Sequence, residues 1–336
     1  MKIQTDWRAT AIPVAGLGSW IHPRRPLGIR PIQIVATSGS GNGRAVDTAR
    51  RLQEALRARG RPVALEVFRE FATLRRWAAS GRVGASLVIG VGGDGTQSTA
   101  AAAAVRGAIP FLSVPSGFGN LFARAFGHVD DVDRAADLVD LGTLVHADVG
   151  MRNGWPFLDQ ESFGFVADIQ AHAEAFRRCP QARWRRWLAY YRGAVRYLRH
   201  AALPALEVTV DGRLVTRRAA VVTVANVATY DPWLPLTPEA SPVDGLLDVL
   251  VLEAPSKPAL LAKLLRRHLR VPGTDPDTRL YRGRRVAVMS PPLGRDLIDL
   301  LPGRLPVLVS TETARRLHRD GQSPDGLAGG GDRRAA

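Results

Sequence analysis

The sequence is poor in cysteine and in long apolar runs, and each shortage excludes a class of protein. The single cysteine, Cys179, cannot form an internal disulfide in this chain of 336 residues, which excludes a disulfide-stapled scaffold. No apolar run reaches the roughly 18 residues of a membrane span, because Arg106 and Asn226 interrupt the best candidates. The N-terminal residues lack the basic-then-apolar layout of a signal peptide. We therefore expect a cytoplasmic protein that is not integral to a membrane.

Lysine is also scarce, although positive charge is not. Only Lys2, Lys257 and Lys263 occur, and arginine supplies most of a net charge of +15. Such a charge attracts phosphate, nucleic acid or an anionic lipid surface. The sequence has neither zinc-ligand spacing nor a nucleic-acid-binding motif. We therefore expect a phosphate-bearing or lipid partner and no nucleic acid.

Strand and helix patterns alternate along residues 31–145. Short apolar strands are separated by amphipathic helices: strands at 32–36, 63–68, 86–91 and 109–114, helices at 45–59 and 70–79. This alternation predicts a Rossmann-like, three-layer α/β domain whose parallel sheet is covered on both faces. Ligands of such sheets bind beyond the carboxyl ends of the strands. Three polar loops fall there, at residues 37–44, 92–96 and 115–120.

The pattern changes after about residue 146. Short strands separated by Gly, Pro and Asn predict an antiparallel β-sandwich domain over residues 146–304, with helices near 183–199 and 256–270. A strand and a helix at 305–318 are expected to complete the first domain. Residues 1–30 form an irregular arm in this interpretation, and residues 321–336 a disordered tail. The fold class is therefore α/β plus all-β.

The most informative segment is Gly-Gly-Asp-Gly-Thr at residues 92–96, between an apolar strand and an alanine-rich run. Glycines let the backbone approach a polyphosphate, and the N-terminus of the following helix stabilises its charge. The Asp94 carboxylate suits Mg²⁺ held between phosphate oxygens. The alternative is an ordinary strand-to-helix turn with Thr96 as N-cap.

Together with three other segments, this motif resembles the diacylglycerol kinase catalytic family, bacterial lipid kinases that include sphingosine-kinase-like members. Residues 37–45 resemble the family's Asn-Pro-x-Ser-Gly-x-Gly-Arg-Ala loop, and residues 115–124 resemble Pro-x-Gly-Thr-x-Asn-x-x-Ala-Arg. Residues 241–248 resemble the Asp-Gly-x-Leu-Asp segment. The resemblance covers roughly residues 31–318.

The resemblance implies transfer of the γ-phosphoryl group of ATP, with Mg²⁺, to the hydroxyl of diacylglycerol or a related lipid. It implies that Asp94 holds the catalytic Mg²⁺, and that Asp244 with the backbone carbonyls of Ser241 and Leu246 holds a second, structural Mg²⁺. For Asp244 an ordinary Asp-Gly turn is an equally weighted alternative. The implied nucleotide-binding residues are Thr37, Ser40, Gly41, Gly92, Gly93, Gly95, Thr96, Gly117 and Asn120.

The chain departs from the family pattern at several positions, most of which cost a carboxylate. The family's Asp-Gly-Glu, whose glutamate is the implied base, is best matched by Asp299-Leu300-Leu301. Either Asp168 or Asp299 is expected to replace the lost carboxylates, or the chain is a weak or inactive relative. The other departures are Phe118 for Thr, Ser98 and Thr99 for Asn-Glu, and Val166 for Asp.

Residues 183–199 combine arginines with Trp and Tyr at helical spacing. Such a helix suits docking on an anionic membrane surface, although a helix that covers a β-sheet would look similar. We expect a lipid substrate and peripheral membrane association, and we allow for a homodimer. The alternatives are a soluble kinase like the NAD kinases, which also carry Gly-Gly-Asp-Gly-Thr, and a non-catalytic relative that binds nucleotide or lipid.

Overall fold

The chain forms two compact units in a computed structural model. Unit 1 comprises Met1–Asp159, Ser241–Gly245 and Leu300–Gly326, and unit 2 comprises Gln160–Ala240, Leu246–Asp299 and Leu327–Ala336. Residues 146–159, 241–245 and 300–304, which the sequence pattern assigns to the second domain, therefore cluster with unit 1. The structure describes residues 21–22, 30–81, 83–117, 119–176, 192, 195–196, 202–228, 236–269, 275–290, 294–321 and 333–334.

Most of three expected segments lies outside the described residues. These segments are the N-terminal arm, the basic aromatic helix at 183–199 and the tail at 321–336. Within the described ranges, no helix has both the length and the apolar character needed to cross a bilayer.

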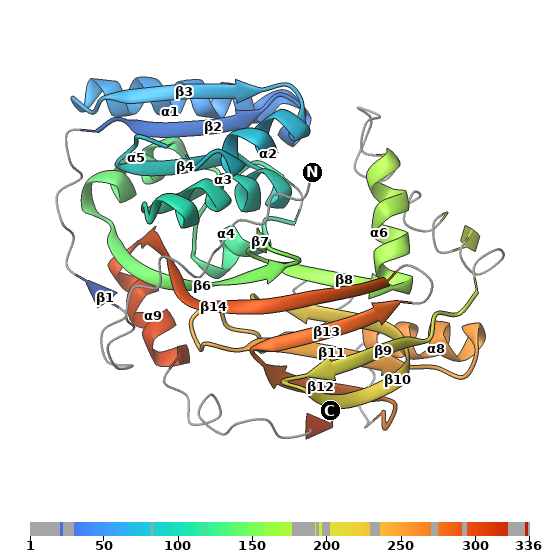
Figure 1. The fold of residues 1–336 in the computed structure, drawn as a ribbon. Helices are drawn as coiled ribbons and strands as arrows, with labels where there is room; N and C mark the ends of the chain where they lie inside the picture. The colour runs from blue at the N-terminus through green and yellow to red at the C-terminus, as the bar shows by residue number, and fades with distance from the viewer. Residues whose placement is uncertain are drawn as a thin grey trace. The chain divides into compact units, whose positions relative to one another are not determined.

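Unit 1 is built on a parallel sheet with the strand order β3-β2-β4-β5-β14. Figure 1 shows β3, β2 and β4 of this sheet. Parallel strands need crossover connections, which helices supply here. At the last position of the sheet, Val307 of β14 pairs with Phe111 of β5. The strands are β2 (Ile32–Thr37), β3 (Val63–Phe68), β4 (Leu87–Gly92), β5 (Phe111–Pro115) and β14 (Gly294–Val309).

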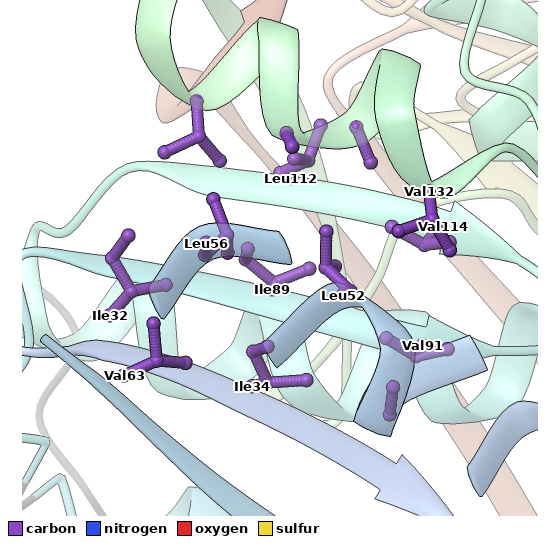
Figure 2. Packing of buried hydrophobic residues seen from close by; sticks show 14 of the residues in the cluster. Ile32, Ile34, Leu52, Leu56, Val63, Ile89, Val91, Leu112, Val114 and Val132 are labelled. Atoms are coloured by element: carbon purple, nitrogen blue, oxygen red, sulfur yellow. The ribbon is translucent and has the colours of Figure 1, made fainter. Parts of the chain in front are cut away.

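One face of this sheet packs against α1 (Arg44–Ala58) and α5 (Val132–Leu141) in a single hydrophobic cluster. Figure 2 shows Leu52 and Leu56 of α1 among side chains of the sheet strands. The sequence forms this layer because apolar residues recur every three or four positions along both helices.

The other face of the sheet packs against α3 (Asp94–Gly107), which contacts α2 (Phe71–Ala79). Successive side chains of a strand point to opposite faces, and Gly90 lies between Ile89 and Val91 of the α1 cluster. A Cβ on Gly90 would lie 3.1 Å from the Cβ of Ala100 on α3. Small residues on both elements therefore let α3 approach the sheet closely, and the expected three-layer arrangement is confirmed.

The remaining elements of unit 1 are short or lie beside the sheet. These remaining elements are β1 (Ile21–His22), η2 (Ser40–Gly43), α4 (Leu121–Ala125), β6 (Thr143–Arg152), β7 (Trp155–Phe157) and α9 (Thr311–Gly321). Two of the six, η2 and α4, follow strands of the sheet and take part in the site described below.

Unit 2 is an antiparallel β structure. Its longest strand, β10 (Arg213–Ala225), pairs with β8, β9 and β11, and β13 pairs with β9 and with residues 294–299 of β14. The expected second, antiparallel β domain is therefore confirmed. The other elements are β8 (Gln160–Gly164), β9 (Leu206–Val210), β11 (Leu247–Glu253), β12 (Thr278–Gly283), β13 (Arg285–Ser290), β15 (Arg333–Arg334), α6 (Phe165–Phe176) and α8 (Lys257–His268).

A buried histidine links β5 to β14 inside unit 1. Nε2 of His128 lies 2.7 Å from the backbone oxygen of Leu308, and Nδ1 lies 2.6 Å from Oγ of Ser113. A carbonyl can only accept, which assigns the ring proton to Nε2 and leaves Nδ1 to accept from the Ser113 hydroxyl. Burial lowers the pKa of His128 to about 4, against the opposing effect of the Leu308 hydrogen bond. His128 is therefore neutral at physiological pH.

This arrangement predicts acid sensitivity of unit 1. The unfolded chain takes up the His128 proton near pH 6.5 and the folded chain near pH 4, so stability is lost as pH falls between these values. Unit 1 should be less stable by about 2 kcal/mol at about pH 5 than at about pH 7 on account of this residue. Urea unfolding at both pH values measures the difference. The variant His128→Gln should show a correspondingly smaller loss, and an equal loss in both proteins would contradict the assignment.

Candidate functional site

Three loops of unit 1 begin where neighbouring parallel strands end. Strand β2 ends at Thr37, β4 at Gly92 and β5 at Pro115, and Gly92 is the direct partner of Pro115 in the sheet. Because β4 pairs with both β2 and β5, the three carboxyl ends lie side by side. The contacts below show that the loops also hold one another.

Three hydroxyl groups join the first loop to the second. Oγ1 of Thr37 lies 2.6 Å from Oγ of Ser40 and 3.0 Å from Oγ1 of Thr96, and Ser40 and Thr96 are also 3.0 Å apart. Thr37 and Thr96 are buried, whereas Ser40 is half-buried. The cluster fixes the η2 turn against the start of α3.

Glycines let the backbone of one loop pack directly against the backbone of the next. A Cβ on Gly41, which has a φ of 60°, would lie 2.4 Å from the backbone oxygen of Ser116 in the third loop. A Cβ on Gly117 would lie 2.5 Å from Cα of Gly93. Gly92 receives hydrogen bonds on its carbonyl from the Ser116 backbone N–H and from the Gln97 side chain. Side chains at Gly41 and Gly117 would therefore separate the three loops.

Asp94 joins the second loop to the third through its carboxylate. One oxygen accepts the backbone N–H of Asn120 and the other accepts that of Leu121, both at 2.8 Å. These N–H groups lie at the N-terminus of α4, where intrahelical partners are missing and negative charge is stabilised. Asp94 therefore fixes the third loop in addition to any role toward a ligand.

Asn120 closes the third loop on itself. It adopts a left-handed conformation with a φ of 50°, which asparagine tolerates better than most residues. Its Oδ1 accepts the Gly117 N–H at 3.0 Å, and its Nδ2 donates to the Gly117 carbonyl at 2.9 Å. Phe118, the expected departure between them, lies outside the described residues.

The donor groups around these loops fit a polyphosphate. The first turn of α3, including Gly95 and Thr96, presents backbone N–H groups without intrahelical partners. Within the described residues the buried Oγ of Ser116 has no hydrogen-bond partner. The guanidinium of Arg44 is exposed at the start of α1, and its Nε donates to the Gly41 carbonyl. Ser116 and Arg44 are not among the residues predicted from the sequence, although both lie within the motifs at 37–45 and 115–124.

A divalent metal would find few protein ligands at this site. The described ranges contain no group of three His, Cys, Asp or Glu side chains placed to share an ion. Asp94 is the acidic side chain of the three loops. Mg²⁺ commonly takes one or two carboxylates and completes its shell with phosphate oxygens and water. The residues therefore fit a metal that arrives with a nucleotide better than a permanently held ion.

The expected structural metal site lies in a segment held by another carboxylate, Asp148 of β6. This fully buried side chain accepts the backbone N–H groups of Gly245 and Gly303, each at 2.7 Å. Its own N–H donates to the Pro242 carbonyl. Asp148 is not among the residues predicted from the sequence, although an acidic residue within an apolar strand is a signal of a buried, hydrogen-bonded carboxylate.

Two of the three expected ligands of that metal, Ser241 and Asp244, lie in the segment Ser241–Gly245 of unit 1, and Leu246 begins the next segment of unit 2. Asp244 is half-buried. Oγ of Ser241 is buried and has no hydrogen-bond partner in the described part of the chain. Mg²⁺ prefers oxygen ligands. The Asp244 carboxylate, the neighbouring backbone carbonyls and the Ser241 hydroxyl are ligands of this kind.

The two candidate bases, Asp168 and Asp299, lie in unit 2. Asp299 accepts from Nε of Arg285 at 2.7 Å in a partly exposed ion pair. Asp168 is exposed on α6. Val166, at the position of the family's aspartate, packs against the hydrophobic cluster of α6 and α8. Asp168 follows Val166 by two positions, which is about 200° around a helix. Asp168 therefore lies on the side of α6 away from Val166.

Two family models match this chain, one over its α/β part and one over its antiparallel β part. Residues 31–152 match the model of the diacylglycerol kinase catalytic domain. Residues 162–298 match the model of the YegS C-terminal NAD kinase beta sandwich-like domain. The two matches follow each other along the chain and correspond to the α/β and the antiparallel β parts.

Individual relatives agree with these matches. A diacylglycerol kinase of Mycobacterium tuberculosis is 29% identical over 229 residues, which are 66% of this chain and 73% of that protein. An uncharacterized Synechocystis protein is 30% identical over 169 residues, half of this chain, but the match spans only 38% of that relative.

A crystal structure of a candidate diacylglycerol kinase from Bacillus anthracis superposes with a TM-score of 0.65. The superposition covers 84% of this chain and 96% of that chain at 17% identity, which shows a shared fold. On the two domain matches and these relatives, the chain belongs to the diacylglycerol kinase catalytic-domain family.

Proposed function

We propose that the protein is a lipid kinase that transfers the γ-phosphoryl group of ATP to the hydroxyl of diacylglycerol or a related lipid. The observation that carries this proposal is the set of interlocked loops at the ends of β2, β4 and β5. They combine backbone donors, close-packed glycines and one carboxylate in a chain of this family. Phosphoryl transfer depends mainly on positioning and on neutralising charge, which such a site can supply.

In the proposed reaction the lipid hydroxyl oxygen forms a bond to the γ-phosphorus. The bond from that phosphorus to the β–γ bridging oxygen breaks, and ADP leaves. Thr37, Ser40, Thr96 and the glycine backbones would hold the phosphates, and Asp94 would hold Mg²⁺ while it also fixes Asn120. When bound, Mg²⁺ would neutralise charge on the phosphate oxygens. The hydroxyl proton would pass to a carboxylate, Asp168 or Asp299.

A second candidate function is nucleotide or lipid binding without catalysis, and two observations favour it. Thr99, at the position of a family glutamate, is buried and donates its hydroxyl to the Gly95 carbonyl of its own helix. Val166 contributes to a hydrophobic cluster at the position of a family aspartate. Neither position supplies a carboxylate that could hold a metal or accept a proton.

The first test is a labelling experiment on the full chain. Incubation with γ-labelled ATP, Mg²⁺ and a total lipid extract in mixed micelles should give a labelled lipid. The variant Asp94→Ala should lose about a hundredfold or more of this activity, because a lost ligand for charge neutralisation costs several kcal/mol. A parallel reaction offers NAD as the acceptor. Labelled NAD without labelled lipid would overturn the lipid assignment, and ATP binding without any product would favour the non-catalytic function.

The same variant separates the two roles of Asp94. If the carboxylate only fixes the third loop, Asp94→Ala should weaken nucleotide binding equally with and without Mg²⁺. If it also holds the metal, the variant should in addition reduce the gain in ATP affinity that Mg²⁺ provides. Isothermal titration of ATP in Mg²⁺ and in EDTA measures both quantities.

A second prediction concerns the close approach of the loops. The variant Gly41→Ala should weaken ATP binding by about tenfold or more, because its Cβ would meet the Ser116 carbonyl and because its φ of 60° disfavours alanine. Gly39→Ala is the matched control in the same loop, since nothing lies within 4 Å of a Cβ there. Equal affinities of the two variants would contradict the proposed cradle.

A third prediction concerns the base. One of the variants Asp168→Asn and Asp299→Asn should lower turnover by about a hundredfold or more and leave ATP affinity unchanged. Asp296→Asn, three residues before Asp299 on β14, is the control. Loss of the partly exposed Asp299–Arg285 pair should leave the stability of the protein nearly unchanged, because solvent screens such a pair. Full turnover in both variants would show that neither carboxylate is the base.

A further inference from the structure

Helix α8 exposes apolar side chains on its outer face. Leu261 and Leu265 of α8 and the C-cap residue Leu269 are 44%, 53% and 61% exposed, and they follow one another at intervals of four residues. They are three of the ten large exposed apolar side chains among the described residues, and the other seven occur on several different elements. A spacing of four aligns side chains along one row of a helix.

The apolar character covers the whole outer arc of the helix. At about 100° per residue, Pro258 and Ala262 fall in the same arc as the three leucines, which spans about 100°. Both are exposed as well. The buried residues Leu260 and Leu264 lie on the opposite side, where they pack in the cluster shared with α6, β10 and β11. The helix therefore has an apolar face toward its own unit and a second apolar face toward solvent.

Two cations flank the outer arc, Arg266 on one side and Lys257 on the other, and α8 contains no acidic residue. Arg266 is exposed at the edge of the outer arc. Lys263 is tied to Asp275 and Asp277, and Arg267 donates to the Leu236 carbonyl. These bonds fix the rotation of the helix and therefore keep the leucines outward. An apolar stripe flanked by cations is typical of a helix that lies in a membrane interface.

We propose that the outer face of α8 docks on an anionic lipid bilayer. The leucines would enter the headgroup boundary, and Arg266 would contact the anionic headgroups. The charge of the whole chain, +15, favours the same partner. The proposal goes beyond the proposed reaction, because it concerns the surface to which the protein binds and does not depend on the phosphoryl acceptor.

A second copy of the chain fits this face less well. Helix α8 has 12 residues, and at about 18 Å by 10 Å its outer face covers only about 200 Å². Stable protein interfaces bury about 800 Å² on each partner. Two copies of a helix without acidic residues would also bring like charges together. A bilayer has neither difficulty, because it has no minimum contact area and supplies the opposite charge.

Vesicle sedimentation of the full chain tests the proposal. The protein should bind vesicles that contain phosphatidylglycerol and phosphatidylcholine more strongly than vesicles of phosphatidylcholine alone. The double variant Leu261→Gln/Leu265→Gln should bind the anionic vesicles at least about tenfold more weakly. The variant Leu141→Gln is the matched control on another helix, because Leu141 is 80% exposed at the end of α5. It should bind like the unchanged protein.

Further measurements distinguish docking on a bilayer from pairing with a second copy and from the proposed reaction. Equal vesicle binding by the double variant and the control would overturn the proposal. A dimer in light scattering that becomes a monomer in the double variant, with vesicle binding unchanged, would assign the face to a second copy. ATP affinity should be the same in all three proteins, because the nucleotide loops lie in unit 1. A protein that binds anionic vesicles through α8 but phosphorylates no lipid would refute the proposed reaction and leave the docking face intact.

Discussion

One buried carboxylate determines how the chain returns to unit 1. Asp148 accepts the N–H groups of Gly245 and Gly303, which belong to segments that are almost 60 residues apart in sequence and lead back from unit 2. An isolated buried charge would be very costly, and these backbone donors offset that cost. Without the Asp148 carboxylate, the segment that carries Asp244 and the half of β14 beside β5 would lose the hydrogen-bond acceptor that they share. Unit 1 is therefore completed by residues that follow it far along the chain.

The α/β part of the fold could be predicted from the sequence because its signals are local. Apolar runs of five or six residues separated by helical periodicity place β3 at its observed bounds and α1 within one residue. The meeting of the three loops follows from topology, since the ends of neighbouring parallel strands share one edge. Asp94 could be selected as a candidate site residue from its glycine-rich segment, whereas Gly41 and Asn120 are candidates only through the resemblance to the kinase family. The contacts among these residues could not be predicted, because they depend on which strands are neighbours in the sheet.

The features that sequence reasoning missed depend on tertiary contacts or on weaker signals. The sequence predicts a strand only from residue 305, yet β14 runs through Pro302 and Gly303, and Asp148 accepts the Gly303 N–H. Helix α5 did have a signal, because the Asp131 carboxylate caps it ahead of apolar residues at helical spacing. The outer face of α8 could not be recognised from periodicity alone. Its leucines look like core residues until the structure shows that Leu260 and Leu264 fill that role.

The contacts of Asp94 also bear on the cost of binding. A flexible glycine loop must lose conformational entropy when it closes on a ligand, and that loss weakens the complex. Here the Asp94 carboxylate, the Thr37–Ser40–Thr96 hydroxyls and the Asn120 side chain tie the loops together by hydrogen bonds of their own. In the proposed function, these hydrogen bonds would lower the entropy that the loops lose when they close on the phosphates of a nucleotide.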